Sequence, residues 1–187
     1  MQNAKCKMHW LATASFCILH FSFCITVSHA APRFVSEYTG ISIERDCTMA
    51  TQGADYAEYQ CPGHDGFRVR IVSGEGAASL GIARGRETES ILHPDDLAQT
   101  IAGVPPFSSP FVSGDTLEWR YRTEGATKTL VAVIFRISDQ AWPEKNILFV
   151  ARAQPDRFCA LGFAKTNAAA RALADASGAN CKMQNAK

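Results

Sequence analysis

Apolar and polar side chains alternate along two stretches of the chain, residues 67–73 and residues 116–122. Successive side chains of a β-strand point to opposite faces, so this alternation predicts two strands that each bury one face. Residues 128–138 contain a nearly continuous apolar run, which is typical of a central strand covered on both faces. Weaker patterns of the same kind predict further strands at residues 41–47, 57–61, 78–83, 146–152 and 158–163.

The sequence pattern changes from that of a strand to that of a helix in the last predicted element. Residues 168–177 are rich in strong helix formers, with Asn167 placed as the N-cap and Gly178 placed to end the helix. Small side chains on one face of this helix predict close packing against a sheet. The whole pattern therefore predicts a mainly β (α+β) fold: one antiparallel sheet or flattened barrel of about seven to eight strands, with one C-terminal helix.

The first thirty residues have the order of an export signal. Lys5 and Lys7 precede a long apolar run over residues 10–27, and the small residues Ser28 and Ala30 then occupy positions −3 and −1 before a cleavage site after Ala30. This order predicts a secretory signal peptide over residues 1–30, followed by a single domain over residues 31–187 in the periplasm or outside the cell. The alternative is a retained membrane anchor, although polar residues dilute the run. No second apolar span follows, so no membrane span is expected after signal removal.

Composition and charge narrow the function classes. The chain has 187 residues, 47% of them hydrophobic, which suits one globular domain. It contains 19 basic and 18 acidic residues, and removal of Lys5 and Lys7 leaves 17 basic residues against those 18. A nearly neutral domain has no long-range field to gather nucleic acid, so we expect no nucleic-acid partner.

Four cysteines remain after the signal: Cys47, Cys61, Cys159 and Cys181. An even number in a small exported domain predicts two disulfides. Neighbours in sequence are the favoured pairs, Cys47 with Cys61 and Cys159 with Cys181, because the C-terminal helix can return the chain toward the strand before it. A metal site made of these cysteines with a histidine is the alternative. No two of them have the close spacing that zinc ligands usually show, so no metal site is predicted.

Four arginines form the candidate binding residues. Arg68 and Arg70 lie on the polar face of one alternating strand, and Arg120 and Arg122 lie on that of the other. If the two strands are neighbours, these side chains form a patch for a carboxylate-rich glycan, a peptide or an acidic protein. The alternative is a solvated sheet face on which Glu118 supplies the local counter-charge.

No catalytic motif occurs in the sequence. His64 and His93 are the two histidines outside the signal, and neither has a recognisable nucleophile setting. His64 lies in a Pro-Gly-His-Asp-Gly stretch that predicts a tight turn, and we keep it as a further candidate binding residue. Glycines 74 and 76 follow a strand, but a hairpin turn explains them better than a phosphate loop. We therefore predict no catalytic residue and no cofactor.

Several short motifs resemble those of a known group. Residues 59–66 (YQCPGHDG), 117–120 (LEWR), 133–136 (VIFR) and 158–159 (FC), followed by a helix rich in alanine, resemble a group of small exported bacterial proteins without an assigned function. The Tyr-x-Cys strand with its glycine turn is also similar to that of periplasmic lysozyme inhibitors. These resemblances imply an exported domain with structural cysteines, and they imply no catalytic residues.

The expected function is that of an exported, non-enzymatic envelope protein that binds a protein or glycan partner. The alternatives are a module similar to lysozyme inhibitors and a hydrolase whose site the sequence does not reveal.

Overall fold

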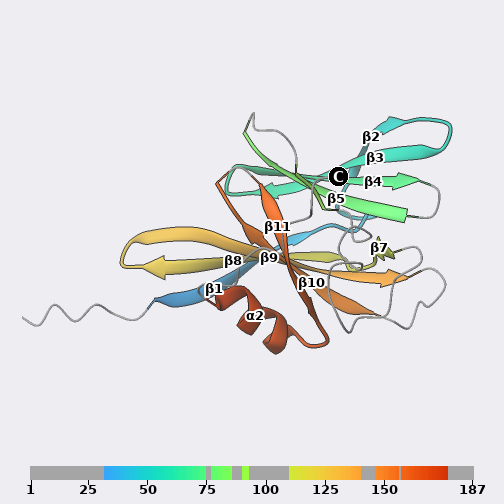
Figure 1. Cartoon of the computed structure of the whole chain (residues 1–187). Helices are drawn as coiled ribbons and strands as arrows, with labels where there is room; N and C mark the ends of the chain where they lie inside the picture. The colour runs from blue at the N-terminus through green and yellow to red at the C-terminus, as the bar shows by residue number, and fades with distance from the viewer. Residues whose placement is uncertain are drawn as a thin grey trace, which may run out of the picture.

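Two antiparallel sheets and one helix make up the described part of the chain (Figure 1). The computed structural model describes residues 32–74, 77–85, 90–92, 110–139, 146–155 and 157–176. We call the six-stranded sheet, which contains both β1 and the strands next to the helix, sheet A. The five-stranded sheet is sheet B.

Sheet A is built around its two longest strands. Its order is β1-β8-β9-β10-β11, and β7 pairs with β9 beyond the end of β8. The strands are β1 (Arg33–Gly40), β7 (Pro110–Val112), β8 (Thr116–Glu124), β9 (Thr127–Asp139), β10 (Ile147–Ala153) and β11 (Phe158–Ala164).

Sheet B is a meander in which each strand pairs with the next along the chain. Gly74 pairs with Ala77, so β4 and β5 form the predicted hairpin and not the strand and helix of a phosphate loop. The strands are β2 (Thr48–Gln52), β3 (Tyr56–His64), β4 (Phe67–Gly74), β5 (Ala77–Arg84) and β6 (Ser90–Leu92).

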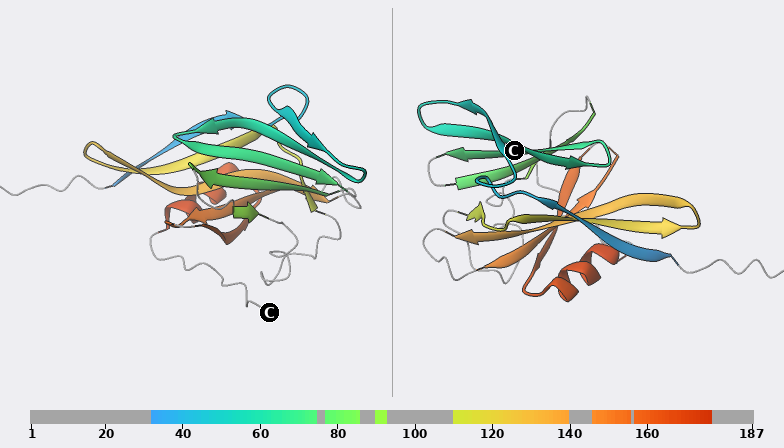
Figure 2. Two further views of the ribbon diagram at one scale, coloured as in Figure 1. Left: turned by 90° about the horizontal axis from the view of Figure 1, so that it is seen from above. Right: turned by 180° about the vertical axis from the view of Figure 1, so that it is seen from behind.

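The main core lies between the two sheets, which pack as layers (Figure 2). Trp119 and Phe135 of sheet A and Val69 and Leu80 of sheet B contribute to it, and none is more than 1% exposed. The inward residues of β4 and β8 are the apolar residues of the two alternating stretches. The sequence prediction for both strands is therefore confirmed.

Helix α2 (Asn167–Asp175) covers the face of sheet A that points away from sheet B (Figures 1 and 2). Ala170 and Ala174 are fully buried against the sheet, where small side chains allow the helix to approach closely. Strand β9 is therefore covered on both faces, as its apolar run predicted. The N-cap is Thr166, whose hydroxyl accepts a bond from the Ala169 amide at 3.2 Å, so the prediction of Asn167 as the cap was wrong.

The mainly β class with a C-terminal helix is confirmed, but the arrangement differs from the predicted one. Among the described residues there are eleven strands in two sheets, rather than seven or eight in one sheet or a flattened barrel. The connection between the sheets explains part of the difference. Residues 43–46 form a turn and not the predicted strand, since the amides of Arg45, Asp46 and Cys47 all donate to the Ser42 carbonyl. The preceding strand, β1, is not among the strands that the sequence pattern predicted.

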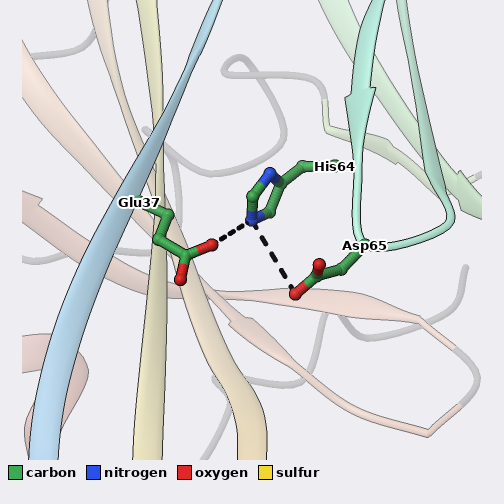
Figure 3. Close-up of side chains that lie close together, drawn as sticks. All are labelled: Glu37, His64 and Asp65. Carbon is green, nitrogen blue, oxygen red and sulfur yellow. Dashed lines mark hydrogen bonds and ion pairs between the residues drawn. The ribbon is translucent and has the colours of Figure 1, made fainter.

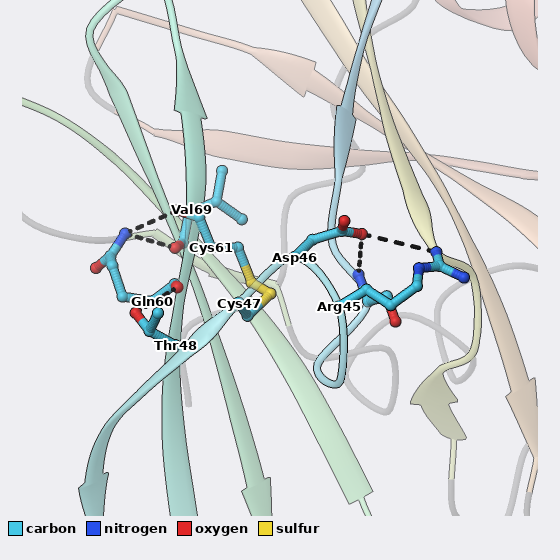
Figure 4. Close-up of a disulfide and its surroundings, with 8 residues drawn as sticks. Arg45, Asp46, Cys47, Thr48, Gln60, Cys61 and Val69 are labelled. Atoms are coloured by element: carbon cyan, nitrogen blue, oxygen red, sulfur yellow. Dashed lines mark hydrogen bonds and ion pairs between the residues drawn. A yellow bond between two sulfur atoms is a disulfide. The ribbon is translucent and has the colours of Figure 1, made fainter.

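One of the two predicted disulfides is confirmed. Cys47 and Cys61 are bonded, and they join the start of sheet B to its second strand (Figure 4). Cys159 is not a free thiol. Its predicted partner, Cys181, lies outside the described residues, as do the predicted signal peptide and Gly178, so that pairing stays a prediction.

Candidate functional site

The four predicted arginines do not form one patch. Arg68 and Arg70 lie on β4 in sheet B, whereas Arg120 and Arg122 lie on β8 in sheet A. The condition for the patch was that the two strands are neighbours, and they belong to different sheets. Nor does Glu118 face solvent as a counter-charge, because the face of sheet A that carries it is covered by α2 and only 6% of it is exposed.

Most of these arginines have structural partners. Arg120 makes a two-pronged ion pair with Asp175 at the end of α2, with distances of 2.6 and 2.8 Å. Arg70 pairs with Glu58 of the neighbouring strand at 2.7 Å, and Arg122 pairs with Glu124 at 3.2 Å. Arg120 therefore holds the helix to the sheet, and its guanidinium is not offered to a ligand.

His64 lies where the two sheets meet, beside two carboxylates (Figure 3). It ends β3, and the turn after it, Asp65-Gly66, has positive φ values of 48° and 79°. Asp-Gly suits such a turn because both residues tolerate this backbone region. The sequence predicted a tight turn here. The turn itself is shorter than predicted, since Pro62 and Gly63 still belong to the strand.

The His64 cluster consists of Glu37, His64, Asp65, Tyr121 and Lys128. His64 Nε2 lies 2.5 Å from Glu37 Oε2, and Lys128 Nζ lies 2.6 Å from the other oxygen of Glu37 and 3.0 Å from Asp65 Oδ2. An ionised carboxylate can only accept, so the bonded ring nitrogen of His64 carries a proton. Glu37 and Lys128 come from sheet A, while His64 and Asp65 come from sheet B. The ion pairs and hydrogen bonds of this cluster thus connect the two sheets.

The charges in this cluster shift several pKa values. The hydrogen bond from Lys128 is the largest cause that holds the pKa of Glu37 and of Asp65 below their ordinary values. In return, Glu37 raises the pKa of the Lys128 ammonium. Burial, followed by the nearby Asp65 carboxylate, raises the pKa of the Tyr121 phenol, which therefore stays protonated at neutral pH.

The cluster has ligand types that could hold a metal, but a lysine ammonium already pairs with both of its carboxylates. One atom each from Glu37, His64 and Asp65 lies within 4.8 Å of the others. The Lys128 ammonium contacts both carboxylates. A hydrolase would need a nucleophile bonded to the histidine, and no serine, threonine or cysteine of the described residues hydrogen-bonds to His64. His93 lies outside the described residues.

We expect Lys128→Gln to flatten the acid dependence of stability. The pKa values of Glu37 and Asp65 are lowered on folding from 4.5 and 3.8, so each carboxylate stabilises the fold above its unfolded value. That contribution is lost as the pH falls through the lowered folded pKa values. Without the ammonium, which is the largest cause of the lowering, both folded pKa values rise toward the ordinary ones. NMR titration of the side-chain carboxyl carbons of Glu37 and Asp65 measures these two pKa values. Lys165→Gln, at an exposed lysine, is the matched control. Unchanged pKa values in Lys128→Gln would contradict the assignment.

A cavity of about 430 Å³ lies beside the cluster, between the two sheets. We call it the cleft. Arg84, Thr129 and Arg157 are exposed and line it, so it opens to the surface. Its lining residues are Asp65, Phe67, Ile82, Ala83, Arg84, Tyr121, Lys128, Thr129, Leu130, Ala153, Gln154, Pro155, Arg157 and Phe158.

The cleft was not predicted from the sequence. Of its lining residues none had been singled out as a binding candidate, and the cleft only touches the His64 cluster through Asp65, Tyr121 and Lys128. The lining residues come from both sheets and from the turn between β10 and β11. A surface assembled from segments so far apart in the chain leaves no periodic or spacing signal in the sequence.

Comparisons with protein-family models, with curated proteins and with solved structures found no match for this chain. The fold and the cleft therefore define only a class: a two-sheet β domain with a helix on the outer face of one sheet and a surface cleft between the sheets. Within the described ranges, no helix is both long enough and apolar enough to cross a membrane.

Proposed function

We propose that this protein is an exported, non-enzymatic binding protein whose protein or glycan partner occupies the cleft between the two sheets. The cleft is the observation that carries the proposal. Its volume of about 430 Å³ lies within the range of roughly 300–1,000 Å³ that is usual for ligand sites. It combines aromatic walls, Phe67 and Phe158, with the polar side chains of Arg84, Gln154 and Arg157.

Export is supported by two features of the chain. The order of positive, apolar and small residues over residues 1–30 is that of a secretory signal. The disulfide between Cys47 and Cys61 is typical of proteins that fold in an oxidising compartment. The proposed location is the periplasm or the cell exterior.

Two other functions remain as alternative proposals. A module similar to lysozyme inhibitors is supported by the Tyr59-Gln-Cys61 strand and its glycine turn. It would be abandoned if the purified protein left lysozymes of several classes fully active. A hydrolase has less support, because the bonded nitrogen of His64 faces Glu37. Hydrolysis of any ester, amide or glycoside by the wild type that is lost in His64→Ala would support the hydrolase instead.

The test of the proposed function is a variant with a filled cleft. Thr129 is exposed at the cleft, so Thr129→Trp places an indole there without removing a core side chain. Thr51→Trp adds the same group to exposed β2 and serves as the matched control. The wild-type protein and both variants are applied to an array of envelope peptides and oligosaccharides.

We expect saturable binding of at least one class of array compound by the wild type and by Thr51→Trp. Thr129→Trp should lose most of this binding, since the indole occupies the space of the partner. Binding that is equal in all three proteins would place the partner site elsewhere. Release of modified array compounds over time would show turnover and would contradict a non-enzymatic role.

A further inference from the structure

We propose that the cleft binds a single carboxylate carried on an apolar group, with Arg84 and Arg157 holding the carboxylate. This inference rests on the proposed function, since it names the chemistry of the ligand in the same cleft.

Among the described residues, four charged side chains line the cleft: Asp65, Arg84, Lys128 and Arg157. Lys128 is bound by Asp65 and by Glu37, so its charge is balanced. Neither Arg84 nor Arg157 makes an ion pair with a carboxylate of the described residues. Within the described part of the chain, two guanidiniums without a carboxylate partner therefore face one cavity, and an anionic ligand would complete their pairing.

Each of these guanidiniums is oriented by an uncharged partner. The Arg84 guanidinium lies over the Phe67 ring, 5.2 Å from its centroid. Arg157 Nε donates to Gln154 Oε1 at 3.0 Å, and the backbone of the same turn is closed by a 2.8 Å bond from the Gln154 amide to the Arg157 carbonyl. These contacts orient the side chains without neutralising them, and no other described residue hydrogen-bonds to the terminal nitrogens. Such pre-organisation lowers the entropy cost of binding.

The two arginines approach the cleft from opposite sheets. Arg84 ends β5 of sheet B, and Arg157 directly precedes β11 of sheet A. A planar carboxylate has two oxygens, so one oxygen can meet each guanidinium across the opening. Asp65 lines the same cleft and repels a second negative charge, which favours a monoanionic carboxylate over a dianionic phosphate.

The rest of the cleft accepts an apolar group. Phe67, Ile82, Leu130 and Phe158 line it, and the rings of Phe67 and Phe158 meet edge to face with centroids 6.1 Å apart. A ligand that places its carboxylate between the arginines can lay an aromatic or aliphatic group against these side chains. Free aromatic acids and the C-terminal residue of a peptide both have this chemistry.

The test is a titration of the isotope-labelled purified protein, followed by NMR through the backbone amides of Ala83 and Phe158. The probes are hydrocinnamate and its uncharged amide, phenethylphosphonate, and an acetylated tripeptide that ends in phenylalanine as the acid or as the amide. We expect saturable shifts with the carboxylates and at least about tenfold weaker binding of the matched amides, since each loses a charge-assisted contact. The relative affinity of the free acid and of the peptide acid shows which source the cleft prefers.

Arg84→Ala and Arg157→Ala should each weaken the binding of hydrocinnamate by about tenfold or more. Both arginines are exposed, so the variants should keep the wild-type circular dichroism and melting temperature. Arg45→Ala is the matched control, because it removes an exposed guanidinium from the turn between the sheets. It should bind hydrocinnamate as tightly as the wild type.

Three results would overturn the carboxylate inference. Equal binding of the acids and their amides would leave the cleft a binding site that recognises apolar shape alone. Tighter binding of the phosphonate would assign the arginines to a phosphate. No shift of the cleft amides with any probe would reject this ligand chemistry, and the filled-cleft variant Thr129→Trp would still decide separately whether the cleft is the partner site.

Discussion

Replacing Trp119 with alanine is expected to lower the free energy of unfolding by about 3–5 kcal/mol. The indole is 0% exposed and lies at the centre of the core between the sheets. Its ring packs against Phe67 of the opposite sheet, with centroids 5.4 Å apart, and against His64 at 5.6 Å. Alanine would leave a cavity bounded by both sheets, which cannot close without moving one of them. Equilibrium urea denaturation measures the change.

Two further variants separate packing from hydrogen bonding at this position. Trp119 Nε1 donates to the buried Thr39 hydroxyl at 2.8 Å. Thr39→Val removes the acceptor but keeps the volume, and we expect it to cost about 1–3 kcal/mol because the indole N–H is left unsatisfied. Met49→Ala, at a residue that is 54% exposed, should change stability by less than about 0.5 kcal/mol. A loss below about 1 kcal/mol in Trp119→Ala would be incompatible with this residue at the centre of the core.

Trp119 also shows why part of the fold could be predicted from the sequence. It was placed on the inward face of its strand because apolar and polar residues alternate there, and one-sided burial of a sheet produces that pattern. The same reasoning identified β4, and the unbroken apolar run identified β9 as a strand covered on both faces. These predictions held because each depends on burial, which acts residue by residue.

Pairing between strands could not be predicted in the same way. The alternation of β4 and β8 is equally compatible with one sheet and with two, so the prediction of a single sheet and the arginine patch that depended on it had no independent support. The turn at residues 43–46 decides the matter, because it carries the chain from β1 in sheet A to β2 in sheet B. Ile41, just before this turn, is 1% exposed and enters the core, so the sequence there resembles that of a strand.

The candidate site was the least predictable part. His64 was singled out for its residue type, and the Asp65-Gly66 turn was readable from its sequence. Its partners Glu37 and Lys128 were not, since they lie on strands that only the sandwich brings beside it. Arg120 was predicted as a binding residue, but it is paired with Asp175. Arg84 and Arg157, which line the cleft and have no carboxylate partner among the described residues, were not predicted as binding residues.

The disulfide between Cys47 and Cys61 is expected to have the second largest effect on stability. Its loop spans a sequence separation of 14, for which the chain-entropy model gives about 3 kcal/mol. We therefore expect the double variant Cys47→Ala/Cys61→Ala to lose about 2–4 kcal/mol in free energy of unfolding. Replacing both residues avoids a free buried thiol, which matters because Cys61 is 3% exposed within the core.

The position of this disulfide gives it a second role that the double variant also tests. Cys47 follows the turn that joins the sheets, so the bond fastens the incoming chain to β3 close to His64, the last residue of that strand. Loss of the bond should therefore increase amide hydrogen exchange most strongly in β2, which pairs only with β3, and least in β9 at the centre of sheet A. Reduction of the wild type with dithiothreitol is a weaker test. Cys159 is not a free thiol either, so the reagent would not act on the bond between Cys47 and Cys61 alone. Unchanged stability and uniform exchange in the double variant would show that packing alone holds sheet B in place.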